Sequence, residues 1–372
     1  MQTVFGFLFV WVLLTPSYGQ KPGFCWEAAM TYGRIIKHSP KIRFQIPDHT
    51  FGAGLHFQYQ TYGKEEWEQH QGYPLMGMSL QYFNFGDAEV LGHAVSIYPN
   101  ITLKIVDRPK WMVHFRVGSG LAWLNRTYHH LDNPGNNSIG SQLNNTTGFR
   151  LVLGVPMSSY WTAFIGGSFT HFSNGAIQMP NLGINVPALS ASVRYSPHPI
   201  RSTDFIHWEE SRKPPRRLGA QAYFSIAYKE TNFPGGAKTP VYSGSAAGLY
   251  RISKVQNLLW GLEYEFHQNV FNFTRHTFAV HSREEARIAA RRWMLFLATE
   301  WQFRNTGLLV QIGINVSGKS ALVPYPVYNK LGLRYYFPRI RLLDTQLFAG
   351  IFLKSHMITA DYMALGIGAR IR

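Results

Sequence analysis

The sequence predicts an all-β protein, a single antiparallel transmembrane β-barrel of about 14 strands (roughly 12 to 16), with a short helical segment in one loop. Charged residues make up only 15% of the chain, aromatic residues also reach 15%, and there are 34 glycines among 372 residues. This composition is typical of a wall that faces lipid on one side. Beyond the N-terminus no run of 18 apolar residues occurs, which excludes helical membrane spans. A closed barrel is the remaining structure that can cross a bilayer.

Alternation of apolar and polar residues supports the strands. Clear runs occupy 51–60, 95–105, 308–317 and 362–371, and such runs approach the 9–11 residues that a tilted strand needs to cross a membrane. Similar runs lie near 28–36, 74–83, 111–123, 148–156, 159–173, 187–196, 218–229, 245–253, 257–267, 293–303, 328–337 and 345–355.

The second face of these runs is polar. Arg116 lies between Phe115 and Val117, and Lys330 and Arg334 alternate with apolar residues in the same way. A polar interior behind a lipid-facing exterior is the barrel pattern. A basic secreted β-sandwich would also alternate, but it rarely needs so many long strands in a chain with one cysteine. The barrel is therefore favoured over the sandwich.

The N-terminus predicts export. Residues 1–19 carry no charge and contain an apolar core from Val4 to Leu14, followed by small residues up to Gly19. We interpret them as a signal peptide and residues 20–372 as one barrel domain. The single cysteine, Cys25, excludes an intrachain disulfide. A net charge of +16 fits an anionic lipid surface better than nucleic acid in an exported protein.

Loops separate the runs, and 125–147 is rich in Asn, Gly and Ser. One loop also carries a helix signal, because the stretch from Ser282 to Glu285 forms a capping box that predicts a short helix to about Arg292. We find no Gly-rich phosphate loop and no His cluster with metal-ligand spacing.

The candidate site lies at the end of the run 159–173. Residues i and i+2 of a strand point to the same face, so His171 and Ser173 lie side by side. An imidazole beside a hydroxyl is the minimal arrangement for an activated serine, although His-x-Ser is also compatible with a polar strand end entering a loop. The pair shares its face with Trp161 and Ile165. If that face meets lipid, the pair is suited to an ester within a lipid.

The motif His171-x-Ser173-Asn174, with Asn181 directly after a proline, resembles the signature of the lipid A 3-O-deacylases (PagL-type, also called acyloxyacyl hydrolases). The close match covers about 170–185, and the loop stretch 138–141 is more loosely similar. The resemblance implies a bacterial outer-membrane enzyme with Ser173 as nucleophile and His171 as base. It further implies that Asn174 and Asn181 bind the substrate by supporting the oxyanion hole, without a metal or other cofactor.

The sequence departs from the family at one catalytic position, where Asn185 replaces the usual glutamate that orients the histidine. An amide can accept a hydrogen bond from an imidazole N–H, as in Cys-His-Asn sites, although a remote carboxylate could take that role instead. The chain is also larger than an eight-stranded barrel needs, so we expect additional strands in the same wall.

We therefore expect an outer-membrane serine esterase that removes an acyl chain from lipid A of lipopolysaccharide. Its expected partners are lipid A, lipopolysaccharide and outer-membrane lipids, and not nucleic acid, while the oligomeric state stays open. Two alternatives also stay open at this point. One is a non-catalytic barrel, either a channel or a lipopolysaccharide-binding protein, and the other is a phospholipase.

Overall fold

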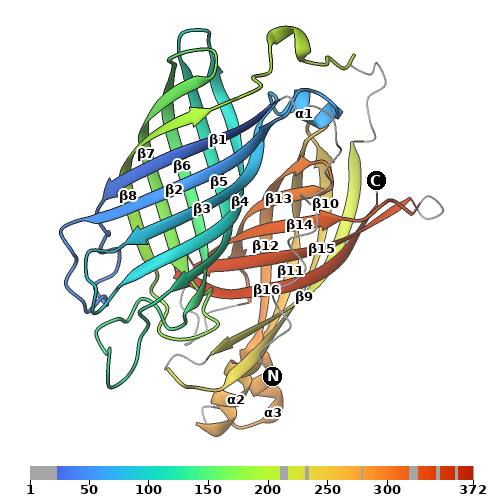
Figure 1. Cartoon of the computed structure of the whole chain (residues 1–372). Coiled ribbons are helices and arrows are strands. Elements are labelled where there is room, and N and C mark those ends of the chain that lie inside the picture. The colour runs from blue at the N-terminus through green and yellow to red at the C-terminus, as the bar shows by residue number, and fades with distance from the viewer. Residues whose placement is uncertain are drawn as a thin grey trace.

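The computed structural model describes residues 23–209, 217–230, 234–277, 280–317, 326–340, 344–356 and 359–371. The predicted signal peptide, residues 1–19, lies outside the described residues and stays a prediction. Within the described ranges the chain forms two closed, antiparallel eight-stranded barrels (Figure 1).

The N-terminal barrel contains the first eight strands, each paired with the next along the chain. It closes where the first strand pairs with the eighth, with Trp26 opposite Tyr195 and Gly33 opposite Ala188. The strands are β1 (Phe24–Gly33), β2 (Thr50–Gln60), β3 (Leu75–Asn84), β4 (His93–Asp107), β5 (Met112–Leu124), β6 (Leu143–Pro156), β7 (Trp161–Ser173) and β8 (Ile184–Tyr195).

The C-terminal barrel repeats this plan and closes by pairing its first strand with its last, with Ser225 opposite Gly366. Its strands are β9 (Leu218–Glu230), β10 (Lys238–Arg251), β11 (Gln256–His267), β12 (Arg291–Phe303), β13 (Thr306–Asn315), β14 (Val327–Tyr336), β15 (Thr345–His356) and β16 (Thr359–Ile371).

The prediction of an all-β transmembrane barrel holds, but the prediction of a single barrel of about 14 strands is wrong. Alternation reports which face of a strand is buried, and it does not report which strands close a barrel. Here β8 returns to β1, so eight strands already form a complete wall. The additional strands form a second barrel instead of widening the first.

Helices occur only in the connections among the described residues: α1 (Glu66–His70), η1 (Ser202–Asp204), α2 (Gln268–His276) and α3 (Arg283–Ala290). The predicted helix and its Ser282 N-cap are confirmed, because Ser282 Oγ accepts a hydrogen bond from the Glu285 N–H at 3.1 Å. The Glu285 carboxylate accepts from the His281 N–H at 2.8 Å and not from Ser282, so the reciprocal half of the predicted capping box does not form. Helices α2 and α3 pack together through Val270, Phe271, Ala286 and Ala290. No described helix is both long and apolar enough to span a bilayer.

Both barrel interiors contain buried polar side chains, as the alternation predicted, together with apolar clusters that include Phe172 in the N-terminal barrel and Phe352 in the C-terminal barrel. In the N-terminal barrel, buried Glu27 forms ion pairs with Arg116, Arg150 and Arg194. The C-terminal barrel contains the buried pairs Glu263–Lys330, Glu265–Lys354 and Glu300–Arg334. Eight strands leave an interior just wide enough for such side chains, so neither barrel encloses an open channel. The outward faces carry exposed apolar residues, including Leu55, Ile97, Leu151, Ile165, Leu189, Phe224, Leu297, Ile312 and Ile367.

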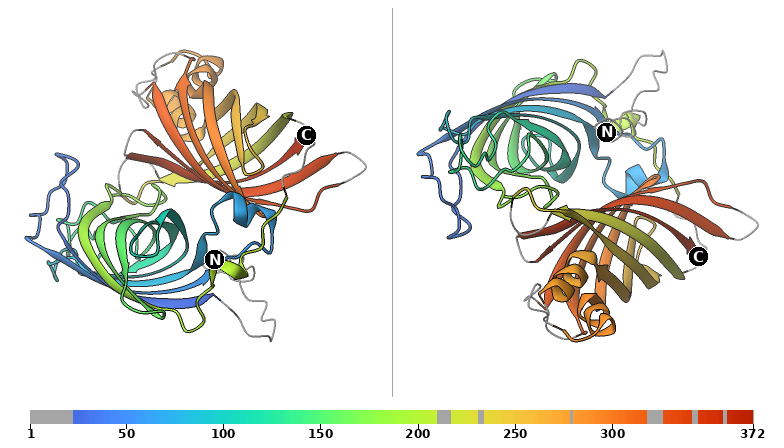
Figure 2. Two further views of the ribbon diagram at one scale, coloured as in Figure 1. Left: turned by 90° about the horizontal axis from the view of Figure 1, so that it is seen from above. Right: turned by 90° about the horizontal axis from the view of Figure 1, so that it is seen from below.

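The two barrels lie side by side in all three views (Figures 1 and 2). At the end that carries α1, Arg304 of the C-terminal barrel forms an ion pair with Glu65 at 2.9 Å, and Phe303 meets the edge of Trp67. At the opposite end, the Met179 N–H donates a hydrogen bond to Glu230 at the end of β9. Helices α2 and α3 and the long connections 34–49 and 125–142 lie at this second end (Figure 1).

Candidate functional site

The end of β7 presents the predicted pair on the outer wall of the N-terminal barrel. Ile165, on the same face, is exposed, whereas Phe172 points inward and is fully buried among the core residues Phe83 and Phe85. By strand parity His171 and Ser173 therefore lie on the outer side of the strand, where His171 is half-buried and Ser173 is buried. The buried Phe172 fixes the register of this strand end, because a shift by one residue would expose its ring.

The structure brings together His171, Ser173 and Asn185. His171 Nε2 lies 2.9 Å from Ser173 Oγ, and His171 Nδ1 lies 2.6 Å from Asn185 Oδ1. Asn185 reaches the imidazole because it is the cross-strand partner of His171 in the β7–β8 pair. With the proton on Nδ1, the ring donates to Asn185 and its Nε2 lone pair accepts the Ser173 hydroxyl proton.

Asn174 and Asn181 define the turn that follows the serine. The Asn174 N–H donates to Asn181 Oδ1 at 3.0 Å, and Asn174 Nδ2 donates to Ser141 Oγ at 3.0 Å and to the Gln178 carbonyl at 2.8 Å. Asn181 is buried, and its Nδ2 has no hydrogen-bond partner among the described residues. The turn thus holds an unused amide donor on Asn181, whose Oδ1 is bonded to the backbone N–H of Asn174, the residue after Ser173.

The connection 125–142 packs against this turn. Gln178 Nε2 donates to the Gly140 carbonyl at 2.6 Å, and the Gly183 N–H donates to the Ser138 carbonyl at 3.0 Å. A Cβ on Gly140 would lie 2.8 Å from the backbone of Met179, so this close approach requires glycine. The stretch 138–141 is therefore the support of the turn.

Sequence reasoning missed several residues of the site. Ser141 and Gln178 hold Asn174, and Glu230 of the C-terminal barrel holds the Met179 amide. Gly183 lies against the imidazole, since a Cβ there would be 2.9 Å from His171 Cε1. The similarity of 138–141 to the family could have indicated Ser141, but nothing in the sequence indicates Glu230, which lies on another barrel.

The alternative of a carboxylate orienting His171 finds no support in the described part of the chain. The two ring nitrogens of His171 are bonded to Asn185 and Ser173. Among the described residues, neither nitrogen forms a hydrogen bond or ion pair with an Asp or Glu. Asp204, one of the distant candidates, accepts instead from the Arg201 N–H at 2.8 Å. Within the same residues no group of three or more His, Cys, Asp or Glu side chains could hold a metal ion.

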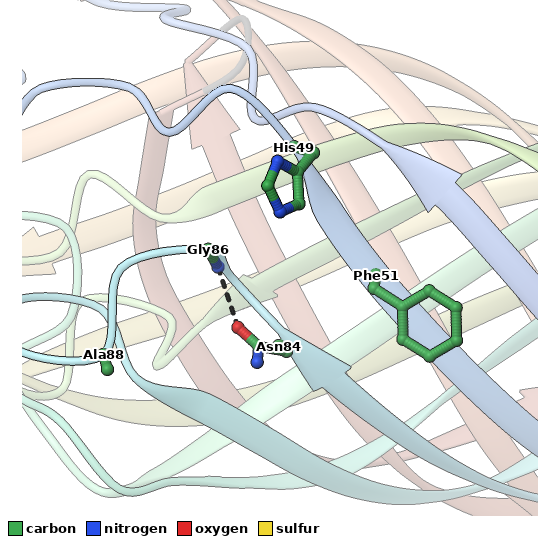
Figure 3. Close-up of a pocket in the computed structure, with 5 residues that line it drawn as sticks. All are labelled: His49, Phe51, Asn84, Gly86 and Ala88. Atoms are coloured by element: carbon green, nitrogen blue, oxygen red, sulfur yellow. Dashed lines mark hydrogen bonds between the residues drawn. The ribbon is translucent and has the colours of Figure 1, made fainter.

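A separate hollow lies on the β2–β3 side of the N-terminal barrel (Figure 3). Its lining residues are His49, Phe51, Asn84, Gly86 and Ala88. Asn84 Oδ1 there accepts a hydrogen bond from the Gly86 N–H at 2.9 Å. None of the five residues contacts His171 or Ser173 through a hydrogen bond, so this hollow is distinct from the Ser-His-Asn site.

Fold and site together define an outer-membrane β-barrel protein with a Ser-His-Asn cluster on the outer side of its N-terminal barrel. Residues 51–194 match the family lipid A 3-O-deacylase (PagL), and residues 219–372 match the family acyloxyacyl hydrolase, C-terminal domain. The two matches span most of the chain and correspond to the two barrels. The N-terminal barrel thus matches the lipid A 3-O-deacylase (PagL) family and the C-terminal barrel matches the acyloxyacyl hydrolase C-terminal domain, so the resemblance identified in the sequence is confirmed.

Solved structures also resemble parts of the chain. The outer-membrane enzyme PagL is 17% identical, with a TM-score of 0.34, over 44% of this chain and 97% of PagL. Neisserial surface protein A is 11% identical, with a TM-score of 0.34, over 47% of this chain and 97% of that protein. OccAB4 of Acinetobacter baumannii is 8% identical, with a TM-score of 0.26, over 95% and 98%. No curated protein matches the chain.

Proposed function

We propose that the protein is a serine esterase of the outer membrane that removes an acyl chain from lipid A of lipopolysaccharide. The observation that carries this proposal is the contact of His171 with both Ser173 and Asn185 on the outer wall of a barrel. An ester nucleophile on such a wall reaches substrates that lie in the membrane. Ionisable groups at this depth are costly and therefore usually functional.

In the proposed reaction Ser173 Oγ attacks the ester carbonyl carbon while His171 Nε2 takes the hydroxyl proton. The tetrahedral intermediate collapses to an acyl-enzyme, and the alcohol oxygen of the sugar leaves with the proton from His171. A water molecule then attacks the acyl-enzyme and transfers its proton to His171. Collapse of the second intermediate releases the fatty acid and returns that proton to Ser173.

The developing oxyanion needs donors that the resting site does not already use. Asn181 Nδ2 is such a donor, because it is buried and has no partner in the described residues. The amide of Asn174 is already bonded to Ser141 and Gln178, so we assign Asn174 to supporting the turn. The proposed roles are therefore a direct donor for Asn181 and a scaffold for Asn174.

Asn185 takes the position of the acidic residue in the proposed site. Its Oδ1 accepts the Nδ1–H of His171 and so selects the tautomer with a free Nε2 lone pair. A neutral amide stabilises the imidazolium less than a carboxylate does, so the orientation of the ring is its main contribution. No step of this chemistry uses a metal or cofactor.

The channel alternative needs an open lumen, and buried ion pairs occupy both interiors. A lipopolysaccharide-binding barrel or a phospholipase would have the same outer wall, but neither would remove an acyl chain from lipid A.

The decisive experiment therefore analyses lipid A itself. It compares lipid A by mass spectrometry from cells that express the protein, the Ser173→Ala variant, or the control Ser168→Ala, which removes a serine hydroxyl from the same strand.

We expect loss of one acyl-chain mass with the parent and with Ser168→Ala, but not with Ser173→Ala. If the parent is correctly inserted and leaves lipid A unchanged, lipid A is not the substrate. If Ser173→Ala removes the acyl chain as fast as the parent, the nucleophile is another residue.

A further inference from the structure

Three polar side chains occur on the outer wall where apolar residues are expected. Ser119 lies on β5, and Asn145 and Thr147 lie on β6. All three have the strand parity of the lipid-facing residues, since Gly118, Asn144 and Thr146, next to them in sequence, are buried. Unpaired polar groups on a lipid-facing wall are costly, so their presence needs an explanation.

The three side chains bond to one another in a closed ring, which we call the polar ring. Ser119 Oγ lies 2.9 Å from Thr147 Oγ1, Thr147 Oγ1 donates to Asn145 Oδ1 at 2.9 Å, and Asn145 Nδ2 donates to Ser119 Oγ at 3.0 Å. Mutual bonding offsets the cost of placing these groups in lipid. The hydroxyl and carbonyl oxygens still have lone pairs that can accept from a ligand.

Apolar residues flank the polar ring on both sides along the strands. Leu121 and Leu143, toward the loop end of the barrel, are 52% and 61% exposed, and Leu151, toward the middle of the wall, is 53% exposed. If the polar ring only marked the boundary between the lipid tails and the headgroups, every outward-facing residue beyond it would also be polar. The polar ring is therefore a local polar site within an apolar surface.

The polar ring also borders the proposed catalytic pair. In the β6–β7 pairing Asn145 is opposite Ser173, and Thr147 is opposite His171. Side chains directly opposite each other in an antiparallel pair have Cβ atoms about 4.5–5.5 Å apart. Together with Asn185 on β8, the polar ring and the catalytic pair form one polar row across four neighbouring strands, β5 to β8.

We propose that Ser119, Asn145 and Thr147 form a binding subsite for the uncharged polar part of the substrate, the hydroxyl and amide groups beside the scissile ester. The subsite contains no cationic side chain, so it does not suit a phosphate group. The apolar residues on both sides of it suit acyl chains. This inference rests on the proposed esterase function and adds the part of the glycolipid that the enzyme recognises.

The test compares two esters with the same acyl length. One is lipid A, and the other is a p-nitrophenyl ester, which lacks hydroxyl and amide groups near the ester. We measure kcat/KM for both in detergent micelles with the parent, Thr147→Val, Ser119→Ala and Thr299→Val. Thr299 is a matched control, because it is a half-buried threonine with outward parity on β12 of the other barrel.

We expect the ratio of kcat/KM for lipid A to that for the p-nitrophenyl ester to fall roughly 3- to 10-fold in Thr147→Val and Ser119→Ala, the effect of one lost hydrogen bond. Thr299→Val should keep the parent ratio. A parent-like ratio in both ring variants would overturn the subsite while leaving the esterase intact. A parent enzyme that cleaves only the p-nitrophenyl ester would also overturn it. Cleavage of neither ester would instead refute the esterase function itself.

Discussion

His171 is held at both of its ring nitrogens, and this double contact determines what the residue can do. Asn185 Oδ1 can only accept the Nδ1–H, whereas its Nδ2 would present a donor to the ring if the amide were reversed. The nearby Ser173 is compatible with either role, since a hydroxyl both donates and accepts. The amide orientation with Oδ1 on the ring is therefore the one that leaves Nε2 free to act as a base.

Substitution of Asn185 tests this reasoning. We expect Asn185→Ala to lower kcat by about 100-fold or more, because the wrong imidazole tautomer loses the base at Nε2. Asn185→Asp, which keeps the size and places a carboxylate at the same point, should be at least as active as the parent. Release of fatty acid from lipid A, measured over time at saturating substrate, distinguishes the two. Equal loss in both variants would show that the amide does more than orient the ring.

Asn181 offers a second test at this scale. Removal of a single oxyanion donor costs about 100- to 1,000-fold in kcat, and we expect Asn181→Ala to fall in this range with little change in KM. The measurement is steady-state turnover of a soluble p-nitrophenyl ester. Because Asn181 also accepts from the Asn174 N–H, Asn181→Asp serves as the control that keeps the acceptor and removes the donor. Asn181→Asp should be as slow as Asn181→Ala, and recovery in it would assign the residue to the turn alone.

How far the sequence predicts these residues depends on how far apart they lie along the chain. His171 and Ser173 follow from strand periodicity alone, because two residues separated by one must share a face. Asn185 was found as the residue at the family's acidic position, and the β7–β8 pairing explains its proximity. The polar ring and Glu230 depend on contacts between different strands and loops, so no local pattern indicates them, whereas Ser141 lies in the stretch 138–141 that resembles the family.

Among the elements, the turn between β7 and β8 carries the tightest constraints. Gly175 and Gly183 have φ angles of 64° and 79°, in the left-handed region that favours glycine. Gly183 also lies directly against His171. The turn therefore combines backbone conformations that only glycine adopts easily with close contact to the base, and both follow from its sequence.

We expect Gly183→Ala to lower kcat by about 10-fold or more while the barrel still folds. The new Cβ would lie 2.9 Å from His171 Cε1, so the imidazole must shift from the position in which it contacts Ser173 and Asn185. Small displacements of a catalytic group can cost about 100-fold in rate. The matched control is Gly167→Ala on β7, where an added Cβ meets nothing within 4 Å. Heat-modified gel mobility checks folding, and a parent-like rate in Gly183→Ala would contradict the proposed ring position.

At the scale of the whole molecule, strand content was predictable and barrel closure was not. Each strand is recognisable from its own alternation, whereas closure depends on whether β8 pairs with β1 or with β9, a choice between partners that look alike locally. The single wide barrel expected from the sequence would have had an open interior. Two narrow barrels instead give filled interiors and a second wall beside the first.

The second wall reaches the turn of the proposed site through residues of β9, β15 and β16. Buried Glu230, the last residue of β9, accepts the Met179 N–H, and Leu353 and Met363 of the same barrel lie against Gly175. Met179 lies between Asn174 and Asn181, so the C-terminal barrel supports the turn that holds the proposed oxyanion donor. The second barrel is therefore expected to position the site and not merely to add membrane surface.

Glu230 is the residue at which this coupling can be tested. We expect Glu230→Ala to lower kcat about 10-fold, because a carboxylate bond to a backbone N–H is worth roughly 1.5–3 kcal/mol and part of it holds the turn. Glu230→Gln keeps a carbonyl acceptor and should restore most of the rate, which a general loss of stability would not allow. Glu284→Ala, which removes an exposed carboxylate from α3, is the control for charge. A parent-like kcat in Glu230→Ala would mean that the N-terminal barrel organises its catalytic turn alone, and the second barrel would then need a role elsewhere in the membrane.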